Sequence, residues 1–186
     1  MTEIVSEELD ESFLRSFFMD FPIAKEEKAI TIKQKYARNG DLLKFAFIKF
    51  ETKEVAQKAI DELNYTKIDG VPIHLMSVED EEKIRSPNKK GNLIVKHIDK
   101  DVEESQLHDA FSNFGYVISV KIPTDLDPKT RERKSRGYAF VQYRDEDDAI
   151  VAIDELQGAC INGTQIEIEK YEARQYQKPE DTFTKN

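Results

Sequence analysis

The residues best suited to chemistry lie in one octamer, Arg136-Gly137-Tyr138-Ala139-Phe140-Val141-Gln142-Tyr143. Side chains of a strand alternate between its two faces, so the first, third, fifth and seventh residues are predicted to share one face. This face carries two aromatic rings beside a cation and an amide, while the other face is typical of a core. Rings that face solvent next to positive charge stack well on unpaired bases. The octamer therefore predicts a surface for single-stranded RNA, and the alternative is an ordinary half-buried strand with two surface aromatics.

The sequence pattern around the octamer occurs twice in the chain. Ile153-Asp154-Glu155-Leu156 repeats Ile60-Asp61-Glu62-Leu63, 93 positions earlier (153 − 60). The same shift places the octamer on residues 43–50, with Phe45 and Phe47 at the ring positions. A shared period of this length indicates two copies of one domain, and the chain has room for two compact units of about 90 residues each.

Each copy is predicted to follow the order strand, helix, strand, strand, helix, strand. In the second copy these elements are expected at 93–98, 103–114, 117–122, 136–143, 146–156 and 165–168, with a polar loop over 123–135. This is the split βαβ, ferredoxin-like order. The predicted fold class is therefore α+β, with two ferredoxin-like βαββαβ domains, each a four-stranded antiparallel sheet backed by two helices.

The first copy follows this order over residues 10–75, except that its strand at 29–33 aligns with 117–121 at a shift of 88. Its opening strand is incomplete, because residues 93–98 shift onto positions 0–5. The strand beside Phe45 and Phe47 would therefore begin at or before Met1. Residues 1–5 form either a degenerate sheet edge or the remainder of a truncated strand. We expect truncation, because an open sheet edge leaves backbone groups unpaired.

Composition and single residues point away from other classes of protein. Hydrophobic residues make up 39% of the chain, and no apolar run approaches the roughly 20 residues of a membrane span. We therefore expect a soluble cytoplasmic chain, with a nuclear location also open, and no membrane partner or signal peptide. Cys160 stands alone and is interpreted as a packing residue. His74, His97 and His108 lack metal-ligand spacing, so no enzyme activity, cofactor or metal is expected.

Net charge opposes a polyanion on average, since the whole chain carries −9. The acid is concentrated in residues 1–82, with 11 Lys or Arg against 18 Asp or Glu, while residues 83–186 carry 17 against 19. In the second half, basic residues gather in the loop before the octamer, where they would track a phosphate backbone. They are Lys129, Arg131, Arg133, Lys134 and Arg136. The alternative is a solvated loop.

The second copy resembles the second domain of a known family. Residues 91–100 (GNLIVKHIDK), 107–115 (LHDAFSNFG) and 119–122 (SVKI) are similar to the opening, first helix and next strand of that domain, and 183–186 (FTKN) to the run into a third. Over nearly its whole length the chain resembles the first two RNA recognition motifs of the cytoplasmic poly(A)-binding protein family. The resemblance implies binding of adenosine-rich messenger RNA in an extended trough, and contact with a translation initiation factor.

Departures from the family pattern reduce the expected stacking. Ile94 and His97 stand where the family has an aromatic residue and an Asn, and Ser77 replaces a Trp. The segment from Val78 to Lys90 contains Glu79-Asp80-Glu81-Glu82 where the family is more basic, which weakens the case for its contact with RNA. Ser86-Pro87-Asn88 in its middle favours a tether that orders on binding.

We interpret the chain as a non-catalytic tandem RNA recognition motif protein. The expected domains are residues 1–78 and 91–172, joined by a linker at 79–90 and followed by a tail at 173–186. The predicted RNA-binding residues are Tyr138, Phe140, Ile94, Lys96, Lys121, Arg136 and Gln142, with first-domain counterparts Phe45, Phe47, Lys33 and Lys49. Rings would stack on bases, Ile94 would serve as an apolar platform, and the cations would contact phosphates or base edges. The alternative is a module that binds another protein through the same fold.

Overall fold

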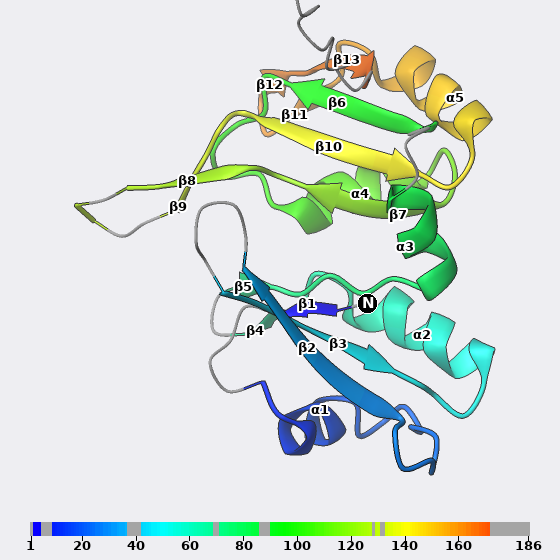
Figure 1. Cartoon of the computed structure of the whole chain (residues 1–186). Coiled ribbons are helices and arrows are strands. Elements are labelled where there is room, and N and C mark those ends of the chain that lie inside the picture. The colour runs from blue at the N-terminus through cyan, green and yellow to red at the C-terminus, as the bar shows by residue number, and fades with distance from the viewer. Residues whose placement is uncertain are drawn as a thin grey trace, which may run out of the picture.

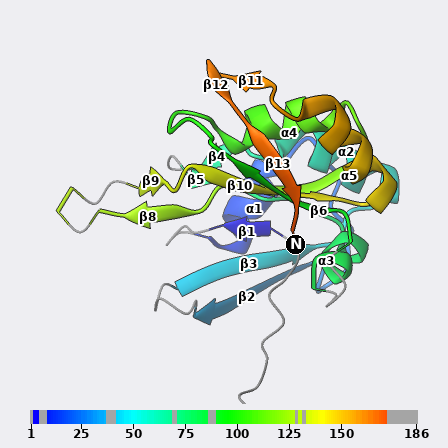
Figure 2. The ribbon, with the colours of Figure 1, turned by 90° about the horizontal axis from the view of Figure 1, so that it is seen from above.

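The computed structural model describes residues 2–4, 9–36, 42–68, 71–85, 90–127, 129–130 and 133–171. The chain forms two α+β units, the first below the second in Figure 1, with one helix at the side between them. Figure 2, the view from above, shows the second unit over the first, with two helices along one side of its sheet. None of the helices in these ranges has the length and apolar character that a membrane crossing requires.

The first unit contains a sheet with strand order β1-β3-β2 and two helices. Its elements are β1 (Thr2–Ile4), α1 (Glu11–Phe17), β2 (Ile30–Tyr36), β3 (Leu42–Ile48), α2 (Lys53–Leu63), β4 (Lys67–Ile68) and β5 (Val71–Pro72). Side chains define where the helices begin, because Asp10 accepts from the Phe13 N–H at 2.7 Å and Thr52 accepts from the Val55 N–H at 3.3 Å. The described part of this sheet has three strands, where four were expected.

The second unit has the expected four-stranded antiparallel sheet, in the order β13-β6-β10-β7. Its elements are β6 (Asn92–Lys96), α4 (Glu104–Ser112), β7 (Val117–Lys121), β8 (Thr124–Leu126), β9 (Arg133–Ser135), β10 (Tyr138–Tyr143), α5 (Glu146–Leu156), β11 (Cys160–Ile161), β12 (Thr164–Gln165) and β13 (Glu167–Lys170). Helix α4 begins with a capping box between Glu103 and Gln106. The ferredoxin-like fold class is confirmed.

The core of the second unit lies between its sheet and its helices. Leu93, Val95, Val120, Ala139 and Val141 have no exposed surface, and they alternate with the residues of the opposite sheet face. Each buried side chain of this kind contributes roughly 1.5–3 kcal/mol relative to an exposed one. The helices therefore cover one face of the sheet and leave the other available.

Strand β1 repeats the register of β6. Thr2 pairs with Ala46 and Glu3 with Phe45, just as Val95 pairs with Ala139 and Lys96 with Tyr138. These four pairs are related by the shift of 93 found in the sequence. The observed register of the opening strand thus follows the repeat, and Glu3 takes the register position that Lys96 occupies in the second sheet.

Two expectations about connecting segments were wrong. The polar loop expected over 123–135 contains a two-stranded hairpin, in which Thr124 pairs with Ser135 and Leu126 with Arg133. The first part of the segment expected to be a tether forms helix α3 (Val78–Arg85), while Ser86-Pro87-Asn88, on which the expectation also rested, lies outside the described residues. Three of the four acidic residues of α3 lie in the first turn, where they complement the helix dipole, and its basic residues lie in the last turn. From sequence, these acidic residues weakened the case for contact with RNA. In the structure, the order of acidic residues followed by basic residues favours a helix.

Candidate nucleic-acid interface

The octamer forms β10 and presents its rings on the open face of the second sheet. Tyr138 and Phe140 are partly exposed, whereas Ala139 and Val141 point into the core. The two ring centroids lie 5.6 Å apart, with the planes at 86°. This edge-to-face contact is a favoured arrangement for aromatic pairs, and it restrains both rings. The face therefore offers a pre-ordered pair of stacking surfaces.

Strand β6 places Ile94 and Lys96 beside these rings. Phe140 is the register partner of Ile94, and Tyr138 is the partner of Lys96. Directly opposite residues on one sheet face have Cβ atoms about 4.5–5.5 Å apart, so the four side chains form one continuous patch. The structure thus brings together four of the predicted residues.

Tyr171 adds a third ring that sequence reasoning did not single out. Its ring lies 5.0 Å from that of Phe140, with the planes at 78°, and its N–H donates to the Asn92 carbonyl at 2.8 Å. The backbone contact extends β13 past Lys170 and brings the ring back over the sheet. An aromatic residue directly after a closing strand was the available signal, but nothing in its spacing showed which way the ring points.

The cations near the rings have acidic partners. The Lys96 ammonium lies 2.6 Å from a Glu169 carboxylate oxygen and 3.4 Å from one of Glu167. The Glu169 hydrogen bond is the main cause of a raised Lys96 pKa, so this side chain stays charged. Arg136 donates from Nε to Asp125 at 2.9 Å. RNA phosphates would have to compete with these exposed pairs, which are individually weak.

The hairpin before the octamer holds its basic residues in a similar way. Lys134 donates to Asp127 at 3.0 Å. The pKa of Asp127 is lowered mainly by the hydrogen bond from the Lys129 N–H and to a smaller extent by the hydrogen bond from the Lys134 side chain. Arg133 is exposed, and Arg131 lies outside the described residues. Of the basic residues in this hairpin, some therefore pair with acidic residues of the same hairpin and others face solvent.

Two predicted residues make other contacts. Gln142 is only 7% exposed, and its amide donates to the carbonyls of Lys90 and Tyr143, both at 2.8 Å. Lys121 is the register partner of Phe140, yet its ammonium lies 3.2 Å from His74 of the first unit. Gln142 therefore fixes the entry into β6, and Lys121 takes part in the contact between the units.

The first sheet offers less exposed aromatic surface. Phe47 is partly exposed and has the Lys33 ammonium 5.0 Å from its ring centroid, a cation–π contact. Phe45 lies 5.9 Å from Phe47 but is only 8% exposed, so stacking on it would require a rearrangement around the ring. Lys49 pairs with Glu26 at 2.6 Å.

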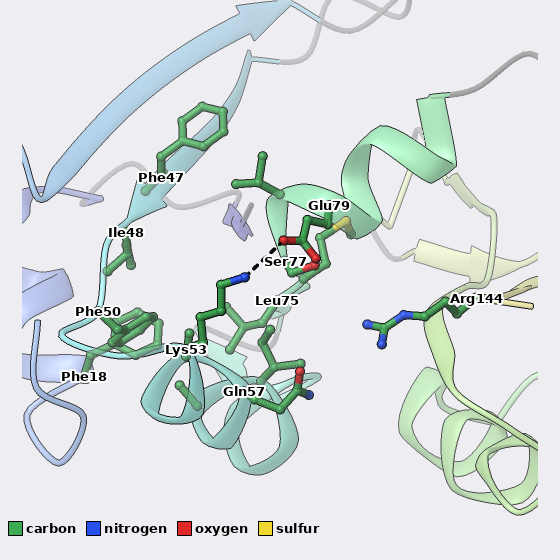
Figure 3. Close-up of a pocket in the computed structure, with 16 residues that line it drawn as sticks. Phe18, Phe47, Ile48, Phe50, Lys53, Gln57, Leu75, Ser77, Glu79 and Arg144 are labelled. Atoms are coloured by element: carbon green, nitrogen blue, oxygen red, sulfur yellow. Dashed lines mark hydrogen bonds and ion pairs between the residues drawn. The ribbon is translucent and has the colours of Figure 1, made fainter.

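A cavity of about 350 Å³ lies next to α2 and does not include the rings of the second sheet. Figure 3 shows its apolar wall, with Phe18 and Phe50 on one side and Leu75 at the centre, and the Lys53–Glu79 ion pair across it. Arg144 of the second unit lines its far side. Within the described ranges, no cluster of His, Cys, Asp and Glu could hold a metal ion.

The fold and the ring-bearing strands define a class of protein. The family model of the RNA recognition motif matches residues 4–74 and 93–167. The chain therefore belongs to the RNA recognition motif family, and it carries two copies of the motif.

Within that class, the chain is similar to poly(A)-binding proteins. Polyadenylate-binding protein 2 of Arabidopsis thaliana is 34% identical over 133 residues, which cover 72% of this chain and 20% of the relative. A polyadenylate-binding protein of Eremothecium gossypii, described as cytoplasmic and nuclear, is 33% identical over 124 residues, covering 67% and 20%. The chain thus spans about a fifth of the length of these relatives. Among solved structures, the first two such domains of yeast poly(U)-binding protein match with 26% identity, 90% and 96% coverage and a TM-score of 0.38.

Proposed function

We propose that this chain binds single-stranded RNA through the open faces of its sheets, without catalysis. The observation that carries the proposal is the set of three rings formed by Tyr138, Phe140 and Tyr171 on the second sheet. RNA recognition motifs bind unpaired nucleotides by stacking the bases on such rings. Every base can stack in this way, because every base has an aromatic face. Ile94 adds an apolar surface beside Phe140.

The preferred ligand is adenosine-rich messenger RNA, such as a poly(A) tail. Support comes from the similarity to polyadenylate-binding proteins over 72% of the chain. The description of the Eremothecium gossypii relative as cytoplasmic and nuclear supports a cytoplasmic location with access to the nucleus. A translation initiation factor is proposed as a protein partner on the resemblance described in the sequence analysis alone. Titration of labelled A, U and C homopolymers at one fixed salt concentration tests the base preference. Tighter binding of U or C than of A would contradict it.

The second domain is proposed to supply most of the affinity. Its rings Tyr138 and Phe140 are both partly exposed, whereas Phe45 of the first sheet is only 8% exposed, and residues 1–82 carry 11 Lys or Arg against 18 Asp or Glu. Replacing both Tyr138 and Phe140 with Ala should therefore cost more RNA affinity than replacing both Phe45 and Phe47. A larger loss from the first-domain pair would contradict this order.

A protein-binding module is the second candidate, favoured by the pairing of Lys96 with Glu167 and Glu169. A face whose cations are already neutralised attracts a polyanion less strongly, and the net charge of −9 acts in the same direction. The salt dependence of binding separates the two candidates. For single strands, each tenfold rise in salt concentration lowers the RNA association constant by about 0.7 logarithmic units per phosphate contact. If the homopolymers show no binding at low salt, the protein-binding candidate is preferred.

A further inference from the structure

Helix α3 carries a buried carboxylate that faces the second domain. The Ser77 hydroxyl accepts from the Asp80 N–H at 3.0 Å and donates to an Asp80 carboxylate oxygen at 2.7 Å. These two bonds hold the Asp80 side chain in one orientation at the beginning of the helix. Only 1% of Asp80 is exposed, so its charge needs a partner inside the protein.

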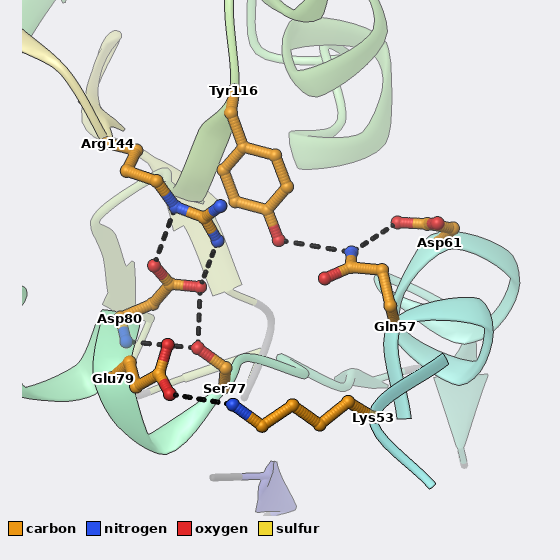
Figure 4. A network of polar contacts seen from close by, with 8 residues as sticks. All are labelled: Lys53, Gln57, Asp61, Ser77, Glu79, Asp80, Tyr116 and Arg144. Carbon is orange, nitrogen blue, oxygen red and sulfur yellow. Dashed lines mark hydrogen bonds and ion pairs between the residues drawn. The ribbon is translucent and has the colours of Figure 1, made fainter. Parts of the chain in front are cut away.

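Arg144, the residue after β10, supplies that partner. Its Nε donates to one Asp80 oxygen at 3.0 Å and its Nη2 donates to the other at 2.8 Å, which is the two-point geometry that suits Arg and a carboxylate. The guanidinium lies 3.7 Å from the centroid of the Tyr116 ring, so it is also held from one side (Figure 4). The Tyr116 hydroxyl in turn accepts from the Gln57 amide of α2 at 3.2 Å. First domain, linker helix and second domain thus meet at Arg144 and Tyr116.

A separate contact joins the domains near the other end of β7. The Val120 N–H, at the free edge of β7, donates to the Tyr65 hydroxyl of the first domain at 2.7 Å. His74 of the first domain lies 3.1 Å from Glu104, and both residues are buried. Tyr116 precedes β7 and Val120 lies close to its end. Contact at both ends of one strand fixes the angle between two bodies, which a single contact would leave free.

We propose that Asp80 and Arg144 are positioning residues that hold the two ring-bearing sheets in a fixed relation, so that one RNA strand engages both. The inference rests on the proposed RNA-binding function. Two linked sites on one ligand bind with an effective concentration set by their geometry, and a fixed geometry that fits the ligand raises it further. The pair touches no RNA in this scheme. It acts only on ligands long enough to reach both sheets.

The test compares short and long RNA on matched variants of the full chain. The short probe has about four adenosines, enough for the two or three bases that one such sheet stacks, and the long probe has about twelve. Arg144→Ala should reduce affinity for the long probe by about tenfold or more, because linkage contributes factors of about 10²–10⁴. The same substitution should leave the affinity for the short probe unchanged within about twofold. Arg144→Lys, which keeps the charge but loses the two-point contact, should give an intermediate loss.

Lys53→Ala is the matched control. Lys53 also pairs with α3, through Glu79 at 3.5 Å, but the two side chains are 90% and 81% exposed. An exposed pair contributes little, so the control should bind both probes as the wild type does. Loss of long-probe affinity in Lys53→Ala equal to that in Arg144→Ala would overturn the specific role of the buried pair.

Residual dipolar couplings provide a readout without RNA. The couplings of both domains should fit one alignment tensor in the wild type and in Lys53→Ala, and two tensors in Arg144→Ala. Two tensors in the wild type, or one in Arg144→Ala together with unchanged long-probe affinity, would overturn the proposal. If the wild type binds neither probe, the proposed RNA-binding function fails instead, while the dipolar couplings still decide whether the pair fixes the domains.

Discussion

Removal of the Phe140 ring is the most direct perturbation of the proposed RNA face. One base stacked on an aromatic side chain contributes about 1–3 kcal/mol. Phe140 is partly covered by Tyr138 at 5.6 Å and Tyr171 at 5.0 Å, so a base reaches only part of the ring. We therefore expect the lower part of that range for Phe140→Ala, about 1–2 kcal/mol, or about 5- to 30-fold weaker binding.

Stability must be measured beside affinity, because the same ring makes two aromatic contacts. Each such pair contributes about 0.5–1.5 kcal/mol, so Phe140→Ala should lower the free energy of unfolding by about 1–3 kcal/mol. The variant should remain folded, since the ring lies outside the buried core cluster. Urea unfolding followed by circular dichroism measures this loss.

The affinity is measured by fluorescence anisotropy with a labelled adenosine oligomer, at a fixed salt concentration and without urea. Ile150→Ala is the control, because Ile150 is exposed on α5, away from the ring-bearing face. It should bind as the wild type does. A folded Phe140→Ala protein with wild-type affinity would refute the assignment of this face to RNA.

Three further substitutions test individual contacts. Ile94→Phe should raise RNA affinity by up to about 1–3 kcal/mol, since a ring beside Phe140 gains part of a base stack; weaker binding by a normally melting variant would exclude the platform role. Tyr65→Phe should lower the free energy of unfolding by about 1–3 kcal/mol, because it leaves the buried Val120 N–H without its acceptor; an unchanged urea midpoint would contradict this. Burial alone would raise the pKa of Glu104, but its interactions with His74 and Lys121 lower it below the usual value near 4.5. A lowered folded-state pKa stabilises the protein above pH 4.5 and loses that effect as the pH falls, so the stability difference between Glu104→Gln and wild type should shrink in acid; a pH-independent difference would refute the linkage.

The sequence by itself determined the repeat, the fold class and the faces of the strands. Alternation in the octamer identified Ala139 and Val141 as core residues and Tyr138 and Phe140 as surface residues, because a strand's side-chain period is local and independent of distant contacts. In the observed sheets the same shift of 93 relates the pair Thr2–Ala46 to the pair Val95–Ala139, because both copies build the same fold. The choice of site residues remains a prediction.

Only the tertiary structure decided what else reaches those faces. Lys121 and Gln142 lie on the predicted side of their strands, yet one contacts His74 and the other holds the Lys90 carbonyl. Nothing local in the sequence relates Asp80 to Arg144, 64 positions away, because an ion pair depends on where separate elements meet in space. For the same reason, the acidic segment that resembled a loose tether is a helix whose buried charge is neutralised by the second domain.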